Sequence, residues 1–166
     1  MSILLIGFMG AGKSTVGRLL AERLGKPFRD LDQLVEEMTQ KKIPQLFAEG
    51  EAVFRKAESE ALIAALAKDQ VIACGGGIVL KEANQALLKE HPQVVYLKGQ
   101  PAALITRIRK DEANIRPLAT EKTALEIQEI LASRLPLYES AATIEVETTA
   151  KTPEQIVTEI LERLEL

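Results

Sequence analysis

The sequence has no tryptophan, and phenylalanine and tyrosine together account for only 4% of its 166 residues. So few aromatic rings suit a hydrophobic core or the wall of a pocket better than a base-stacking surface. Cysteine occurs once, at Cys74, which excludes an internal disulfide and a metal site built from thiolates alone. A chain with this cysteine content is typical of a reducing compartment, and we expect a cytoplasmic protein.

Neither sign of charge dominates, because 21 lysine and arginine residues stand against 24 aspartate and glutamate residues. Such a chain has no overall positive field that attracts nucleic acid or an anionic membrane. Long apolar runs are lacking as well, and the first short one has neither a basic region before it nor a cleavage site after it. We therefore expect no nucleic-acid partner, signal peptide or membrane span, and an anionic ligand must be bound by a local cluster.

The remaining composition is that of a globular protein, with 46% hydrophobic and 27% charged residues. The length suits one domain over residues 1–166. Apolar runs typical of buried strands alternate with amphipathic segments, which predicts an α/β fold with a five-stranded parallel sheet flanked by helices on both faces. The predicted strands are residues 2–6, 27–30, 70–74, 94–97 and 143–146.

Two segments between the strands are relevant to function. Residues 32–60 contain helical patterns, and the polar residues 110–122 lack an apolar period, so we interpret them as a loop that closes as a mobile lid. A further helix is predicted from residue 124 to about 135, where Pro136 is expected to end or kink it.

The first predicted strand leads directly into GFMGAGKST, residues 7–15, which matches the P-loop pattern G-x-x-x-x-G-K-[ST]. In a P-loop, backbone N–H groups and the positive end of the next helix surround phosphate oxygens. Lys13 would reach the β- and γ-phosphates, and Ser14 would bind Mg²⁺. A glycine-rich turn is the alternative, but it must also explain the strand before it and the helix after it. The predicted nucleotide-binding residues of the loop are Gly10, Ala11, Gly12, Lys13, Ser14 and Thr15.

Asp30 and Asp32 come at the end of the second predicted strand. Residues two apart in a strand face the same side, so one carboxylate could support Mg²⁺ and the other could meet a substrate hydroxyl. Asp32 as a simple cap of the next helix is the alternative. Arg55 and Glu58 lie three apart on one helical face and can pair, either as a solvated surface contact or so that Glu58 orients Arg55 toward a carboxylate.

Three glycines at residues 75–77 follow the third strand and permit close approach of a ligand, although a flexible turn is the alternative. The motif order GAGKST, DLD, FRKAE, GGG, RPL and RLPLY, from Gly7 to Tyr138, closely resembles that of the shikimate kinase family. Only the P-loop is specific by itself, whereas the ordered set is highly specific. The resemblance implies transfer of the γ-phosphoryl group of ATP to the 3-hydroxyl of shikimate, a step of aromatic amino acid biosynthesis. We expect the protein to be a monomer.

The resemblance also implies a role for each matched residue. Lys13, Asp32 and Arg116 would be catalytic, with Asp32 binding the shikimate hydroxyls and Arg116 approaching the transferred phosphoryl group from the lid. Ser14 and Asp30 would hold Mg²⁺. The remaining acceptor contacts would be Arg55, Glu58, Gly76, Gly77 and Arg134. The remaining nucleotide contacts would be Arg109, favoured over Arg107, and Lys151.

Two alternatives remain open. One is another kinase on this scaffold, acting on gluconate or a nucleoside monophosphate, but the arginines and carboxylate suit a compact hydroxy acid better than a base. The other is a nucleotide-dependent switch, for which the guanine-reading N-K-x-D or T-K-x-D element and the L-S-G-G-Q signature are absent.

Overall fold

The computed structural model describes residues 1–110 and 123–166, without the side chains of residues 109 and 110. Its five parallel strands form one sheet in the order β2-β3-β1-β4-β5, which confirms the predicted fold class. The three central strands are apolar and almost entirely buried, as a strand covered on both faces requires. The strands are β1 (Ile3–Ile6), β2 (Phe28–Asp30), β3 (Val71–Ala73), β4 (Val94–Lys98) and β5 (Ile144–Glu147).

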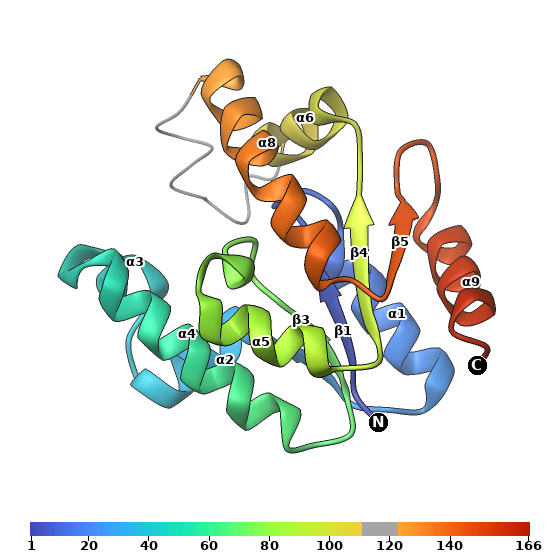
Figure 1. Cartoon of the computed structure of the whole chain (residues 1–166), viewed down its shortest axis with the longest axis horizontal. Coiled ribbons are helices and arrows are strands. Elements are labelled where there is room, and N and C mark those ends of the chain that lie inside the picture. Colours follow the sequence, from blue (N-terminus) through green and yellow to red (C-terminus); the bar gives the residue numbers. More distant parts are fainter. Residues whose placement is uncertain (111–122) are drawn as a thin grey trace.

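Helices cover both faces of the sheet (Figure 1). Helices α1 and α9 pack against each other on one face, whereas α8 contacts β4 and packs with α5 on the other. None of the helices in the described residues is long and apolar enough to cross a membrane. The helices are α1 (Lys13–Leu24), α2 (Leu31–Thr39), α3 (Ile43–Glu49), α4 (Glu51–Leu66), the 3-10 helix η1 (Ile78–Leu80), α5 (Glu82–Glu90), α6 (Pro101–Lys110), α8 (Ala124–Ala141) and α9 (Pro153–Arg163).

Of the two effects expected of Pro136, an end of the helix is wrong, because α8 continues to Ala141. A proline inside a helix removes one hydrogen bond and costs about 3 kcal/mol. Burial of Tyr138 and Ala141, which lie beyond the proline and are almost completely shielded from solvent, offsets this cost. As a result, Arg134 and Tyr138 lie one turn apart on the same helix.

The carboxyl ends of the strands meet at one edge of the sheet (Figure 1). The chain leaves β1 toward β2 and leaves β3 toward β4, in opposite directions across the sheet. Ligands of open parallel sheets bind where the direction of the connections changes in this way. The glycine-rich segments that follow β1 and β3 are therefore brought together at this edge.

Candidate active site

The P-loop joins β1 to α1 in a backbone conformation that depends on glycine. Gly10 and Gly12 have φ angles of 83° and 87°, in the left-handed region that other residues rarely adopt. A Cβ atom at Gly10 would lie 2.8 Å from the carbonyl oxygen of Leu104, so α6 packs directly against the loop. The loop then enters α1, whose N-terminal N–H groups favour an anion.

Two basic side chains donate to carbonyl oxygens of this loop. The Lys13 Nζ donates to the carbonyl oxygens of Gly7 at 2.6 Å and Phe8 at 3.0 Å. Arg107 Nη1 on α6 donates to the carbonyl oxygen of Gly10 at 3.3 Å. Sequence reasoning preferred Arg109 over Arg107 as the arginine nearest the nucleotide. In the structure Arg107 lies at the P-loop, whereas the side chain of Arg109 is outside the described residues.

Asp30 lies beside the P-loop serine. The Ser14 hydroxyl donates to Asp30 Oδ2 at 2.9 Å, while Asp30 Oδ1 accepts the backbone N–H groups of Asp32 at 3.0 Å and Gln33 at 3.3 Å. Asp30 is therefore the N-cap of α2. The structure combines a hydroxyl and a carboxylate oxygen next to the place where phosphates bind.

The prediction that Asp30 and Asp32 share one face of a strand is wrong. Strand β2 ends at Asp30, and Asp32 lies in the first turn of α2. The two-residue periodicity of a strand therefore does not apply. Asp30 points to Ser14, whereas Asp32 Oδ1 lies 3.2 Å from the place that a Cβ atom of Gly75 would occupy. The two carboxylates thus lie in different parts of the site, Asp30 at the P-loop and Asp32 at the glycine segment.

Arg55 and Glu58 on α4 form the predicted pair, with Arg55 Nη1 donating to Glu58 Oε1 at 3.0 Å. Glu58 is only 1% exposed, so the pair is not the solvated surface contact that its spacing alone also allowed. The guanidinium carbon of Arg55 lies 5.1 Å from the ring centroid of Phe54, and this ring stacks on Phe47. A buried carboxylate and aromatic rings thus hold Arg55 in place.

The three glycines after β3 let these side chains pack directly on the backbone. A Cβ atom at Gly75 would lie 2.9 Å from Glu58 Oε2, and one at Gly77 would lie 2.3 Å from Arg55 Nη1. At Gly76 the Cβ would lie 3.6 Å from Nη1 of Arg134. The glycines thus admit the side chains of the site itself, and the close approach of a ligand stays a prediction.

Arg134 on α8 completes this cluster on the side of the P-loop. It is only 9% exposed, and its guanidinium carbon lies 5.8 Å from the ring centroid of Phe8. A Cβ atom at Gly76 would lie 3.5 Å from the backbone nitrogen of Met9, so the glycine segment touches the P-loop. Four residues after Arg134, Tyr138 donates its hydroxyl to the Gly76 carbonyl oxygen at 2.5 Å. Sequence reasoning gave Tyr138 no role in the site, although its spacing from Arg134 places both on one helical face.

Burial is the main influence on the titratable groups of this cluster. It raises the pKa of Glu58 above its usual 4.5, and the charge and hydrogen bond of Arg55 oppose this shift. It also raises the pKa of the Cys74 thiol, the first residue after β3. Cys74 is therefore a protonated, unreactive part of the core rather than a nucleophile.

The raised pKa of Glu58 makes the stability of the protein depend on pH. The folded state binds the Glu58 proton more tightly than the unfolded state does. The contribution of this proton to the free energy of unfolding is therefore fully present below about pH 4.5, and it is lost as the pH rises through the pKa of Glu58 in the folded state. We expect the free energy of unfolding of the wild type, relative to Glu58→Gln, to fall with rising pH by at most about 1.4 kcal/mol per pH unit. Urea titrations at several pH values measure this difference.

The matched control is Glu60→Gln, which removes an exposed carboxylate from the same helix. Its stability should follow the wild-type pH profile. Parallel profiles for the wild type and Glu58→Gln would show that Glu58 has the same pKa in both states and would contradict the prediction.

Of the further residues predicted on the nucleotide side, Lys151 alone has a side chain within the part of the chain that the structure describes. Arg116 lies outside the described residues, as does the side chain of Arg109. Lys151 precedes α9, and its Nζ pairs with Glu159 Oε1 at 2.8 Å. Its charge is therefore already partnered on α9.

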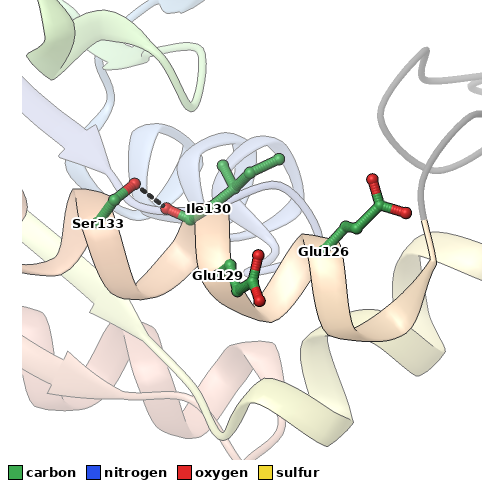
Figure 2. Close-up of a pocket in the computed structure, with 4 residues that line it drawn as sticks. All are labelled: Glu126, Glu129, Ile130 and Ser133. Atoms are coloured by element: carbon green, nitrogen blue, oxygen red, sulfur yellow. Dashed lines mark hydrogen bonds between the residues drawn. The ribbon is translucent and has the colours of Figure 1, made fainter.

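A hollow of about 270 Å³ on α8 lies apart from these residues. Figure 2 shows its four lining side chains, Glu126, Glu129, Ile130 and Ser133, all on this one helix, with the Ser133 hydroxyl bonded to the carbonyl oxygen of Ile130. Two carboxylates in its lining make it unsuited to a phosphorylated or carboxylate ligand.

A parallel sheet with a P-loop after its first strand, and with a second arginine-bearing cluster touching that loop, defines a P-loop kinase of small molecules. A sequence model of the family described as "Shikimate kinase" matches residues 9–165. The chain is 44% identical over 164 residues to the shikimate kinase of Enterococcus faecalis, and the alignment covers 98% of each protein. This chain belongs to the shikimate kinase family.

Solved structures agree with this assignment. The shikimate kinase of Acinetobacter baumannii in complex with shikimate superposes with a TM-score of 0.91 at 36% identity, covering 98% of this chain and 92% of the other. A gluconokinase from Sinorhizobium meliloti covers 99% of this chain and 91% of its own, with a TM-score of 0.67 at 24% identity. The second likeness shows only a shared fold.

Proposed function

We propose that this protein transfers the γ-phosphoryl group of ATP to the 3-hydroxyl of shikimate, forming shikimate 3-phosphate and ADP. One observation carries the proposal: Arg55 and Arg134 both contact the three-glycine segment, and that segment touches the P-loop. Two guanidinium groups there can bind the carboxylate of the acceptor. The acceptor hydroxyl then lies near the phosphates held by the P-loop.

Each residue on the acceptor side of the site has its own role. Arg55 and Arg134 bind the carboxylate, and Glu58 orients Arg55 through their 3.0 Å hydrogen bond. Asp32 faces the glycine segment from α2 and binds the acceptor hydroxyls, while Gly76 and Gly77 contact the ring through their backbone. The hydroxyl oxygen forms a bond to the γ-phosphorus, the bond from that phosphorus to the β,γ-bridging oxygen breaks, and Asp32 accepts the hydroxyl proton.

The nucleotide side consists of Gly10, Ala11, Gly12, Lys13, Ser14 and Thr15. When ATP binds, Lys13 would give up its hydrogen bonds to the Gly7 and Phe8 carbonyl oxygens and form hydrogen bonds to oxygens of the β- and γ-phosphates. Arg109, Arg116 and Lys151 are proposed as further contacts, with Arg116 in a lid of about residues 110–122. For Lys151 this requires release from Glu159.

The oxygens of Ser14 and Asp30 fit Mg²⁺. Magnesium prefers hard oxygen ligands and usually keeps several waters, taking one or two protein ligands and phosphate oxygens. The described residues contain no group of three or more histidine, cysteine, aspartate or glutamate side chains that could form a full metal cage, and Mg²⁺ with a nucleotide needs none. When bound, Mg²⁺ neutralises phosphate charge and orients the phosphates.

The acceptor panel that tests this function compares shikimate, gluconate and nucleoside monophosphates with no acceptor, and measures ADP formation with Mg·ATP. Shikimate alone should stimulate ADP formation strongly. Arg134→Lys should raise the KM for shikimate about tenfold, because lysine keeps the charge but loses the bidentate contact. The KM for ATP should stay within about twofold, since Arg134 binds the acceptor.

Other outcomes of the panel have definite meanings. Stimulation by gluconate or a nucleoside monophosphate instead of shikimate would keep the kinase and reject the acceptor. Phosphate release stimulated by a partner protein and by no acceptor would favour the nucleotide-dependent switch.

The remaining parts of the proposal concern the whole molecule. We propose one domain over residues 1–166, with acceptor-binding helices at about 32–60, acting as a cytoplasmic monomer. The buried, unpaired Cys74 supports a reducing compartment. Light scattering after size-exclusion chromatography tests the monomeric state.

A further inference from the structure

We propose that Tyr138 is a positioning residue of the acceptor site. Its hydroxyl fixes the positions of two groups, the peptide group between Gly76 and Gly77 and the guanidinium of Arg134. In this way it sets the affinity for the acceptor. The inference rests on the acceptor site proposed above. It assigns a task to a side chain that lies in the core rather than in the site itself.

Tyr138 is completely buried, with no exposed surface. Its ring stacks on Tyr96 with 5.1 Å between the ring centroids, and its hydroxyl donates to the Gly76 carbonyl oxygen at 2.5 Å. Burial raises the pKa of Tyr138 to about 12. The hydroxyl therefore keeps its proton at neutral pH and remains a hydrogen-bond donor.

Three consecutive glycines need such an anchor, because glycine has more backbone freedom than any other residue. The carbonyl oxygen of Gly75 accepts from the N–H of Ile78, and that of Gly77 accepts from the N–H of Leu80. Tyr138 supplies the partner for the carbonyl between them. Because the peptide group is planar and trans, the N–H of Gly77 then points away from Tyr138 in a fixed direction.

Arg134 lies one turn earlier on α8 and approaches the same glycine that the Tyr138 hydroxyl contacts. Burial raises the pKa of Tyr138, and the charge and hydrogen bond of Arg134 act against this rise. Nη1 of Arg134 also lies 3.6 Å from the place of a Gly76 Cβ atom. Tyr138 thus joins two groups that we assign to the acceptor, one backbone and one side chain.

The test is Tyr138→Phe, which keeps the stacked ring and removes only the hydroxyl. We expect the KM for shikimate to rise about tenfold, since a buried carbonyl loses its donor and the glycine segment gains freedom. The KM for ATP should change less than about twofold, because the P-loop keeps its own contacts. The matched control is Tyr96→Phe, which removes a neighbouring buried hydroxyl from the same ring stack.

Arg55→Lys separates failure of this inference from failure of the acceptor site. If Arg55→Lys raises the KM for shikimate and Tyr138→Phe does not, the role of Tyr138 is rejected and the site stands. If Arg55→Lys also leaves the KM unchanged, the proposed site fails and the inference fails with it. An equal rise in Tyr96→Phe and Tyr138→Phe would indicate a general packing effect and would likewise overturn the inference.

Discussion

The Asp32→Asn variant is expected to turn over about 10²- to 10⁴-fold more slowly than the wild type, which is the range for loss of a general base. Asparagine has nearly the shape of aspartate and still binds hydroxyl groups, but it cannot accept a proton at neutral pH. The KM for shikimate should therefore change little while kcat falls. Steady-state rates with saturating Mg·ATP and varied shikimate measure both quantities.

The position of Asp32 supports this expectation. It lies in the first turn of α2, and Oδ1 is 3.2 Å from the place of a Gly75 Cβ atom, on the side of the glycine segment where Arg55 and Glu58 also pack. Both carboxylate oxygens of Asp30 already accept hydrogen bonds, one from the Ser14 hydroxyl and one from the N-terminal turn of α2. Asp30 therefore cannot replace Asp32 as the general base.

Glu37→Gln is the matched control, because it removes a carboxylate from the same helix, where Glu37 pairs with Arg29 at the surface. This variant should keep wild-type kcat. Nearly full turnover by Asp32→Asn would exclude proton transfer to Asp32 and leave it an orienting role.

The fold was predictable because its central strands are buried on both faces, which leaves short, continuous apolar runs in the sequence. The helical patterns expected within residues 32–60 did not separate the seven-residue helix α3, since it is too short for helical periodicity to stand out and contains Pro44. The positions of Asp30 and Asp32 were misjudged for a related reason. Strand β2 has only three residues, and element boundaries are the least reliable part of a sequence-based prediction.

The site was predictable as a set of residues but not as an arrangement. Spacing alone indicated that Arg55 and Glu58 pair, because both lie on one turn of a helix. Spacing could not show that Glu58 is buried, or that the guanidinium of Arg55 lies against Gly77, since residues far apart in the sequence create both conditions. For the same reason, the role of the glycines became clear only when their neighbours were known.

Gly77→Ala tests this role of the glycines, and we expect it to raise the KM for shikimate about 100-fold. The new methyl group would lie 2.3 Å from Nη1 and 2.5 Å from the central carbon of the Arg55 guanidinium, which must therefore move. Displacement removes two charge-assisted hydrogen bonds to the acceptor carboxylate at roughly 1.5 kcal/mol each, which corresponds to this loss of affinity.

A double-mutant cycle shows whether the methyl group acts through Arg55. Arg55→Ala alone should raise the KM for shikimate by a similar factor, because it removes the same contacts. In the Arg55→Ala background, Gly77→Ala should then add less than about threefold, since no guanidinium remains to be displaced. If the two effects multiply instead, Gly77 acts on the acceptor independently, and the close packing of Arg55 on the glycine backbone is not what the segment provides. Thermal unfolding of all three variants checks that each is folded at the temperature of the assay.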